Sequence, residues 1–275
     1  MTVLLFSLIV FVGAVTAGLV GSLTGLGGGA VIIPLLTVLL GVDIHYAIGT
    51  ALVSVIATSS GSAAAYVKEG ISNIRLGMFL EIATTTGAVL GTVVAAYVPT
   101  NAVAVIFGIV LIFNGANSFL EKEAHQSPES SKLAVWLKLP GTYPTVGGVV
   151  RYGIVNVAGG FAMMVVAGIL SGLLGIGSGA FKVIAMDNIM KVPFKVSTTT
   201  SNFMMGVTAT ASAVVYLQRG YIDPGLCMPV VIGVLLGAML GAKILVKSRV
   251  ESLRAIFATV IMLLAANMIY KGLHH

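Results

Sequence analysis

Long apolar runs separated by short polar segments make up most of the chain. Each run has about 20 residues, the length that an α-helix needs to cross a hydrocarbon core about 30 Å thick. The first run has no positive segment before it and no small-residue cleavage site, so we expect a retained span rather than a signal peptide. The pattern predicts eight transmembrane helices, at residues 2–24, 46–67, 73–97, 101–119, 152–174, 196–217, 224–246 and 251–270.

Two shorter apolar pieces differ from these runs. Residues 30–41 and 180–190 each follow a glycine cluster, at 25–29 and 175–179. At 1.5 Å per residue, a helix of about 12 residues covers only about half of a bilayer. The pattern therefore predicts a half-helix after a glycine-rich break in each half of the chain.

The segment from residue 121 to residue 150 has a different character. It begins with a dense run of charged and polar residues. Residues 133–139 are mildly amphipathic, which favours a position on the membrane surface, whereas the prolines and glycines of 140–148 predict a loop. We interpret 121–150 as a cytoplasmic linker between a first transmembrane repeat (1–120) and a second (151–275).

The composition favours a membrane protein. Hydrophobic residues make up 57% of the chain and charged residues 9%, against about 45–50% and about 25% in soluble domains. The 34 glycines favour closely packed helices over a β-barrel. We predict an all-α polytopic membrane protein in which each repeat has four long helices and one half-helix. The single cysteine, Cys227, excludes an intramolecular disulfide.

The sequence also matches itself at a constant offset of 150 residues, from about residue 17 to residue 122. Apolar residues match easily by chance, but here glycines, hydroxyls, tyrosines and an asparagine match as well. We conclude that the two halves are copies, and we call residues 150 positions apart repeat-related. Identical pairs include Gly18/Gly168, Gly25/Gly175, Gly27/Gly177, Gly29/Gly179, Thr50/Thr200, Thr58/Thr208, Tyr66/Tyr216, Gly87/Gly237, Gly91/Gly241 and Asn117/Asn267.

The positive charges of the loops indicate how the copies are oriented, because Lys and Arg favour the cytoplasmic side. Parallel copies would divide these residues eight to five between the two sides. In inverted copies, each first helix and its half-helix return the chain to the side on which it started. This arrangement divides the positive residues eleven to two between the two sides. We therefore predict inverted-topology repeats, with both termini outside and the linker in the cytoplasm.

Glycine-interrupted short segments in inverted repeats are typical of secondary transporters. A helix that starts after such a break presents unpaired N–H groups, whose partial positive charge favours an anion. Alternatively, the glycines only permit close helix packing, the interpretation that we prefer for Gly18, Gly87, Gly91, Gly237 and Gly241 inside the long helices. The candidate substrate-binding residues at the breaks are Gly27, Gly28, Gly29, Gly177, Ser178 and Gly179.

Lys182 lies one turn into the second half-helix, where the repeat-related residue is Ile32. An ionisable side chain at this depth is a functional candidate, here as the counter-charge of an anion. The alternatives are an ion pair with Asp187 or a side chain that snorkels to the membrane surface. Glu81, about eight residues into a span, is a candidate for ion coupling or for a helix-to-helix hydrogen bond.

Hydroxyl and amide side chains follow each half-helix and could complete the hydrogen bonds of an anion without adding charge. They could equally cap a helix. The candidates are Thr50, Thr200, Ser201 and Asn202. The sequence shows no nucleophile–base set, no metal-binding cluster and no phosphate-binding loop, so we expect no enzyme activity, no cofactor, no metal and no nucleic-acid partner.

At these motifs the sequence resembles the sulfite exporter TauE/SafE family of prokaryotic membrane transporters. The resemblance covers nearly the whole chain and rests on Gly25-Leu-Gly-Gly-Gly-Ala-Val-Ile-Ile-Pro34 and Gly175-Ile-Gly-Ser-Gly-Ala, followed by Gly49-Thr50 and Thr200-Ser201-Asn202-Phe203. It implies export of sulfite or an organosulfonate such as sulfoacetate across the prokaryotic inner membrane, coupled to an ion gradient. The second copy departs from the family pattern at Ser178, Lys182 and Ile184.

Together these patterns predict a secondary transporter, an exporter, whose small anion binds near the membrane midplane between the two half-helix N-termini. The expected partners are the anion, the lipid bilayer and a coupling ion. A passive anion channel and a family member that carries a non-sulfur anion remain alternatives, and an intramembrane enzyme or scaffold subunit is disfavoured. The sequence leaves the oligomeric state open.

Overall fold

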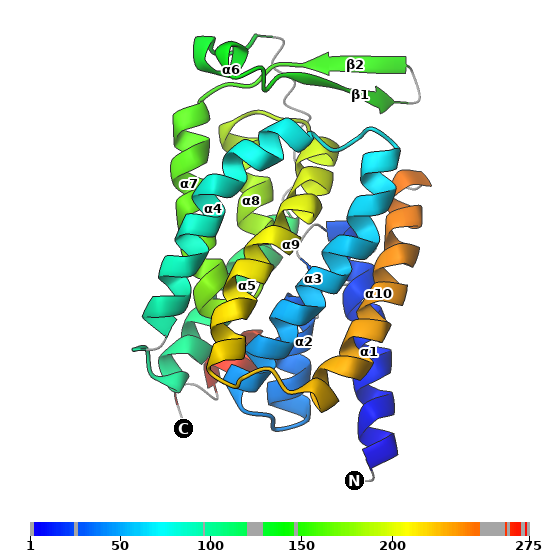
Figure 1. Cartoon of the computed structure of the whole chain (residues 1–275), viewed down its shortest axis with the longest axis vertical. Helices are drawn as coiled ribbons and strands as arrows, with labels where there is room; N and C mark the ends of the chain where they lie inside the picture. The colour runs from blue at the N-terminus through cyan, green and yellow to red at the C-terminus, as the bar shows by residue number, and fades with distance from the viewer. Residues whose placement is uncertain are drawn as a thin grey trace.

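The structure is a computed structural model that describes residues 3–24, 27–95, 97–119, 129–145, 148–247, 262, 265–270 and 273. It is a bundle of α-helices with a small two-stranded sheet at one end (Figure 1). Among the described residues, five helices are long and apolar enough to cross a membrane, which confirms the polytopic helical class. They are α1 (Val3–Thr24), α3 (Ile44–Lys68), α4 (Ile74–Ala95), α7 (Val157–Leu174) and α10 (Pro224–Lys247).

The other three predicted spans have different outcomes. Helices α5 (Thr100–Phe119) and α9 (Phe194–Gln218) occupy two of the predicted positions. Neither is among the five, because the described apolar part of α5 ends at Phe113 and α9 begins with a run of hydroxyl side chains. Most of the eighth predicted span, 251–270, lies outside the described residues.

The two half-helices are present where the glycine breaks predict them. Helix α2 (Gly29–Pro34) and helix α8 (Gly179–Ile184) each have six residues and continue into a π-helical turn of five residues. The chain reaches them through left-handed backbone at Gly27 and Gly177, with φ of 73° and 70°, a conformation that glycine adopts without steric cost. Because Ile184 stands where the first copy has Pro34, the proline is not needed for the π-helical turn.

The predicted loop at 140–148 was wrong. After the short helix α6 (Lys132–Trp136), the chain forms an antiparallel hairpin of β1 (Gly141–Thr145) and β2 (Gly148–Tyr152). Pro144 is tolerated because every strand of a two-stranded sheet is an edge strand, and the threonine, valine and tyrosine residues of the segment favour extended backbone. Because β2 extends to Tyr152, the first helix of the second half begins at Val157 rather than at the predicted residue 152.

Asn73 connects this linker to the helices through hydrogen bonds. Its side-chain amide donates to the carbonyl oxygen of Leu139 and to the hydroxyl of Tyr152, at 2.8 and 2.9 Å. Burial raises the pKa of Tyr152 to about 12, so the hydroxyl stays protonated at neutral pH. The backbone N–H of Asn73 donates to the Thr200 hydroxyl, 2.9 Å away on α9. The turn between α3 and α4, the linker and α9 are therefore joined at one residue.

The 150-residue repeat is visible in the element boundaries. Helix α8 lies exactly one repeat length after α2, α9 after α3, and the start of α10 after the start of α4. The halves are also interleaved, since α1 packs along α10 and α7 packs along α4. The duplicated sequence has therefore folded into two matching sets of helices, each of which packs against the other set.

Glycines bring these helix pairs into backbone contact. A methyl group at Gly18 would overlap with the carbonyl oxygen of Val234, and one at the repeat-related Gly168 would overlap with that of Thr84. Gly87, Gly91, Gly237 and Gly241 are just as close to the facing helix. The packing interpretation of the glycines inside the long helices is confirmed.

The two copies run in opposite directions through the bundle. Helix α4 returns antiparallel to α3 after a short turn, and α9 runs parallel to α4, because Gly77 faces Thr200 near one end and Arg219 donates to the carbonyl of Thr92 near the other. Helix α9 is therefore antiparallel to its copy α3, as Figure 1 shows. Both chain ends lie at one end of the bundle and the hairpin at the opposite end.

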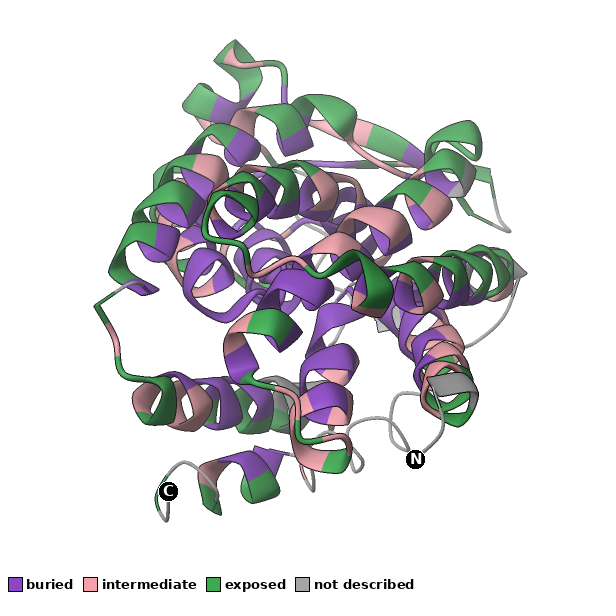
Figure 2. Ribbon diagram, turned by 60° about the horizontal axis from the view of Figure 1, so that its bottom comes forward, coloured by how far each residue is buried: buried purple, intermediate pink, exposed green. Residues whose placement is uncertain are grey.

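The interior is unusually polar for a protein with so few charges. Buried residues face inward between the helices, and exposed residues cover the outer faces (Figure 2). All six residues from Ser197 to Asn202, at the start of α9, are buried. Glu81 and Lys182 are buried as well, so the chemistry of the molecule is concentrated inside the bundle.

Candidate functional site

The two glycine breaks meet inside the bundle. A methyl group added at Gly29 would lie 3.0 Å from the carbonyl oxygen of Gly175. Gly27 and Gly177 both face Val55 on α3 and Met205 on α9, and these two residues are themselves repeat-related. The starts of α2 and α8 therefore approach each other around an approximate two-fold axis that relates the copies.

Hydroxyl groups of α3 surround the first break. A methyl group at Gly28 would lie 3.1 Å from the Thr58 hydroxyl oxygen and 3.5 Å from that of Ser54. Both hydroxyls are buried and donate to carbonyl oxygens of their own helix, each at 2.8 Å. The first break thus combines buried glycine backbone with two neutral hydroxyls.

The second break has a different set of polar neighbours. The Ser178 hydroxyl donates to the carbonyl oxygen of Gly177 at 2.8 Å, and the Ser201 hydroxyl donates to that of Gly179 at 3.1 Å. The Asn202 amide donates to the carbonyl oxygen of Ser22 on α1 at 3.1 Å. The structure therefore brings Ser178 and Ser201 to the second break, whereas the Asn202 amide contacts α1.

Thr50 and Thr200 lie elsewhere. The Thr200 hydroxyl accepts from the backbone of Asn73, and the Thr50 hydroxyl faces the sulfur of Cys227 at 3.8 Å. Thr200 therefore joins α9 to the start of α4, and Thr50 joins α3 to the start of α10. Each contact links the two copies. The structure does not bring them together with the glycine breaks, so the alternative of a local structural role fits them better.

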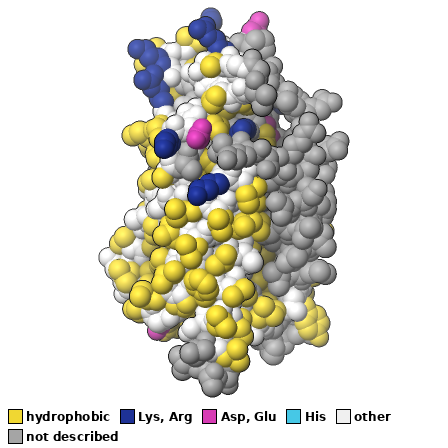
Figure 3. Space-filling view, turned by 90° about the vertical axis from the view of Figure 1, so that its right-hand side faces the viewer, with side chains coloured by type: hydrophobic (Ala, Val, Ile, Leu, Met, Phe, Trp, Pro, Cys, Tyr) yellow, Lys and Arg dark blue, Asp and Glu magenta, His cyan; other side chains and the backbone are white. Residues whose placement is uncertain are grey.

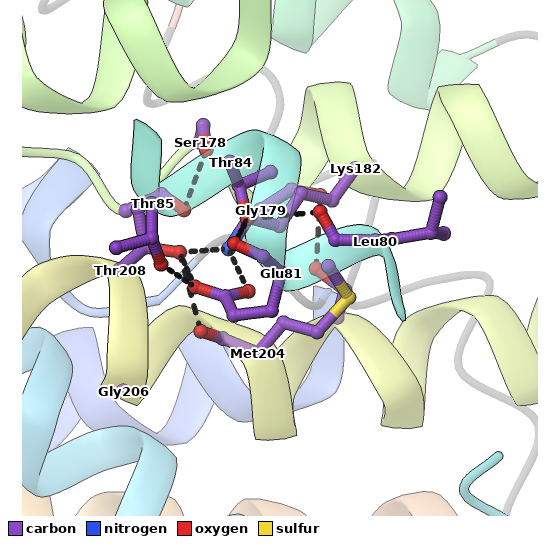
Figure 4. A network of polar contacts seen from close by, with 12 residues as sticks. Leu80, Glu81, Thr84, Thr85, Ser178, Gly179, Lys182, Met204, Gly206 and Thr208 are labelled. Atoms are coloured by element: carbon purple, nitrogen blue, oxygen red, sulfur yellow. Dashed lines mark hydrogen bonds and ion pairs between the residues drawn. The ribbon is translucent and has the colours of Figure 1, made fainter. Parts of the chain in front are cut away.

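Lys182 lies in a polar network that joins three helices (Figure 4). Its ammonium group is 3.5 Å from a carboxylate oxygen of Glu81 on α4 and donates to the Thr208 hydroxyl on α9. Lys182 has no exposed surface and Glu81 is 8% exposed. The carboxylate that Lys182 contacts is thus that of Glu81, 101 residues away in the other copy.

Two hydroxyls donate hydrogen bonds to the Glu81 carboxylate. Thr208 donates to its Oε1 atom across the helix interface, and Thr85 donates to the same oxygen at 3.0 Å from one turn along α4. The helix-to-helix hydrogen bond expected as an alternative for Glu81 is therefore present, together with the ion pair. Sequence reasoning missed Thr208, although its identity with the repeat-related Thr58 was a signal.

The repeat-related position, which also lies between the two copies, has no ion pair. Ile32 replaces Lys182 and Val231 replaces Glu81, while Thr58 is retained in place of Thr208. A buried ion pair is often no more stabilising than a well-packed apolar pair of similar volume, because both charges lose their hydration. The helices therefore accommodate the apolar residues Ile32 and Val231 at the repeat-related position. Packing alone does not account for the charged residues Lys182 and Glu81.

A groove on the outer surface reaches this network from the side. It lies between α4 and α9, has a volume of about 710 Å³, and includes Glu81 and Thr85 in its lining. The remaining lining is mostly apolar: Met78, Ile82, Thr86, Val89, Leu90, Phe203 and Val207. Within the described part of the chain, no group of three or more His, Cys, Asp and Glu side chains could hold a metal ion.

Comparison with known proteins agrees with this architecture. The family model described as sulfite exporter TauE/SafE matches residues 9–268. The chain is 30% identical over 275 residues to the "Probable membrane transporter protein YunE" of Bacillus subtilis (strain 168), covering 98% of each chain. It is 26% identical over 236 residues to the "Probable membrane transporter protein YdhB" of the same organism, covering 84% of this chain and 86% of that relative.

No solved structure matches the chain. The family match nevertheless spans both copies of the repeat, both glycine breaks and the Lys182–Glu81 pair. Both relatives are described as transporters and share most of their length with this chain. The chain belongs to the sulfite exporter TauE/SafE family, and it is therefore a multi-pass membrane transporter rather than an enzyme.

Proposed function

We propose that this protein is a secondary transporter, an exporter, of a small anion such as sulfite or an organosulfonate. The anion binds between the two glycine breaks, with Lys182 as its counter-charge. The observation that carries the proposal is the position of Lys182: an ammonium group without exposed surface, one turn into a half-helix, where the other copy has Ile32. A charge buried at this depth is typical of a substrate or ion pathway.

The remaining site residues follow from the same geometry. Backbone N–H groups at Gly27–Gly29 and Gly177–Gly179, with the side chains of Ser178, Ser201 and Asn202, supply neutral hydrogen-bonding groups around the anion. Such a site resembles the discontinuous helices at which transporters with inverted repeats bind substrates near the midplane. We assign no direct contact to Thr50 or Thr200.

The proposed membrane orientation rests on the distribution of charge. The helices run in opposite directions in the two copies, as transmembrane inverted repeats would. Lys and Arg side chains gather toward the end of the molecule that carries the hairpin, and hydrophobic side chains cover the surface below it (Figure 3). Because positive charges favour the cytoplasmic side, we place the linker in the cytoplasm and both termini outside the bacterial inner membrane.

A thermal-shift screen of the purified protein tests the anion site. We expect sulfite or a sulfonate, among a panel that includes sulfate and carboxylates, to raise the melting temperature by about 5–10 °C at 100 times its Kd. The double variant Glu81→Val/Lys182→Ile reproduces the repeat-related apolar pair Ile32 and Val231, so it should fold, but it should lose this response. Glu81→Gln retains the ammonium group and should keep the response.

Two outcomes would contradict the proposal. If no anion of the panel stabilises the wild-type protein, the anion site does not exist. If the double variant responds as strongly as the wild type, Lys182 is not the counter-charge. Stabilisation by carboxylates alone would support the alternative of a family member that carries a non-sulfur anion.

A further inference from the structure

We propose that Glu81 is a proton-binding counter-ion that holds Lys182 while no substrate is present, so that the transported anion and a proton bind together. This inference rests on the proposed function, because it requires an anion at Lys182. It goes further, because it names the coupling ion and the stoichiometry. The evidence lies in the contacts of one ammonium group.

Among the residues that the structure describes, the Lys182 ammonium contacts one carboxylate. It is fully buried, 3.5 Å from Glu81, and its other contact, Thr208, is neutral. An added monovalent anion would give this buried site a net negative charge, and burying an uncompensated charge is costly. A proton on Glu81 removes that charge. The anion and the negative form of Glu81 therefore exclude each other at Lys182.

The other charged groups of the neighbouring elements lie farther along the helices. Helix α7, which packs on α4, has no charged residue. On α9, Lys195 precedes Thr208 by 13 residues, roughly 20 Å of helix, and Arg219 caps the far end. Arg75 lies at the start of α4, and Asp187 lies in the π-helical turn that packs on α7. Lys182 is thus the charged group that faces Glu81.

Thr208 connects the two states of the pair. A threonine hydroxyl has one donor and can accept two hydrogen bonds. With Glu81 ionised, Thr208 donates to Glu81 and accepts from Lys182, as the structure shows. When Glu81 carries a proton, its O–H can donate to the same hydroxyl oxygen. The Thr208 O–H is then free to turn toward the anion. Protonation of Glu81 therefore makes two groups available to the anion: the Lys182 ammonium as a cation and the Thr208 hydroxyl as a hydrogen-bond donor.

The comparison between the two copies supports a functional role. At the repeat-related position the threonine is kept, as Thr58, but Ile32 and Val231 stand in place of Lys182 and Glu81. The two charges are therefore present together at one of the two repeat-related positions and absent together at the other. Coupling of this kind moves one proton with each monovalent anion in the same direction. The combined movement is electroneutral, so the membrane potential does not drive it. In the export direction the outward gradient of the anion drives both species.

Binding at several pH values tests this coupling directly. Isothermal titration of the purified full-length protein with methanesulfonate, the anion of a strong acid that stays ionised throughout, should give a Kd that rises about tenfold per pH unit once Glu81 is ionised, as linkage to one proton requires. In Glu81→Gln the Kd should be low at every pH and should not change. Thr86→Val, which removes a hydroxyl that donates to the backbone of its own helix, should keep the pH dependence.

A chemical probe gives an independent readout on the wild type. Dicyclohexylcarbodiimide reacts with a protonated carboxyl group: a carboxyl oxygen bonds to the carbodiimide carbon, and the proton moves to a nitrogen. The groove between α4 and α9 offers this apolar reagent a route to Glu81. Because linkage is reciprocal, methanesulfonate should increase Glu81 labelling several-fold at a fixed pH, whereas chloride should not.

The outcomes separate this inference from the proposed function. If methanesulfonate binds with the same Kd at every pH, or if Glu81→Gln keeps the wild-type pH dependence, Glu81 is not the coupling group although the anion site stands. Labelling that is unchanged or reduced by the anion would lead to the same conclusion. If neither methanesulfonate nor any anion of the thermal-shift panel binds, the anion site and this coupling both fail.

Discussion

The Thr208 hydroxyl is the neutral member of the Lys182–Glu81 network, and both charged groups depend on it. It accepts from the ammonium group and donates to the carboxylate. A hydrogen bond to a charged group contributes about 1.5–3 kcal/mol, more than one between neutral groups. The network should therefore be sensitive to the loss of this single oxygen atom.

We expect Thr208→Val to lower the free energy of unfolding by about 2–3 kcal/mol. The repeat-related Thr58→Val is the matched control, because the Thr58 hydroxyl only donates to the backbone of its own helix, and it should cost less than about 1 kcal/mol. Chemical denaturation of both variants in the same detergent gives the comparison. Equal losses in the two variants would mean that the network contributes nothing special to stability.

Single residues of this network could be predicted only in part. Lys182 stands out in the sequence because a charge interrupts an apolar segment. Glu81 stands out in the same way, but its pairing with Lys182 does not, because the two residues are 101 positions apart and meet only through the interleaving of the two copies. Thr50 and Thr200 were predicted at the substrate, but a hydroxyl near a helix start also satisfies backbone groups nearby, and that is how Thr200 is used.

At the scale of elements, the repeat made the half-helices predictable. Glycine clusters at the same offset as the apolar pieces placed the starts of α2 and α8 to within one residue. The hairpin was not predictable in this way. Its prolines and glycines favour turns when the chain is considered locally, whereas the docking of Asn73 onto Leu139 and Tyr152 stabilises extended backbone through contacts distant in the sequence.

The helix-packing glycines give a prediction at this scale. Gly18→Ala and Gly168→Ala should each lower the melting temperature of the purified protein by several degrees, because the added methyl group overlaps with a backbone carbonyl of the facing helix and overpacking costs about 1–3 kcal/mol. Gly13→Ala is the control, because the nearest atoms there belong to the flexible Leu35 side chain. A comparable loss at Gly13 would contradict the proposed importance of backbone contact.

The whole molecule is built from two copies that stabilise each other. Helix α1 packs on α10 and α7 on α4, so neither copy buries its apolar surface without the other. The antiparallel course of the copies brings both half-helices to one central place from opposite sides. Symmetry alone would give two equal positions between the halves, and the Lys182–Glu81 pair makes one of them chemically different from the other.

The most direct test of this account is counterflow in proteoliposomes. Vesicles loaded with unlabelled methanesulfonate are diluted into a trace of the labelled anion, with the membrane potential clamped at zero. The account predicts transient accumulation of label above its equilibrium level by the wild type, and loss of that accumulation in Glu81→Val/Lys182→Ile. Equilibration without accumulation would indicate a passive channel. Equal accumulation by both proteins would contradict the assignment of the transport site to Lys182.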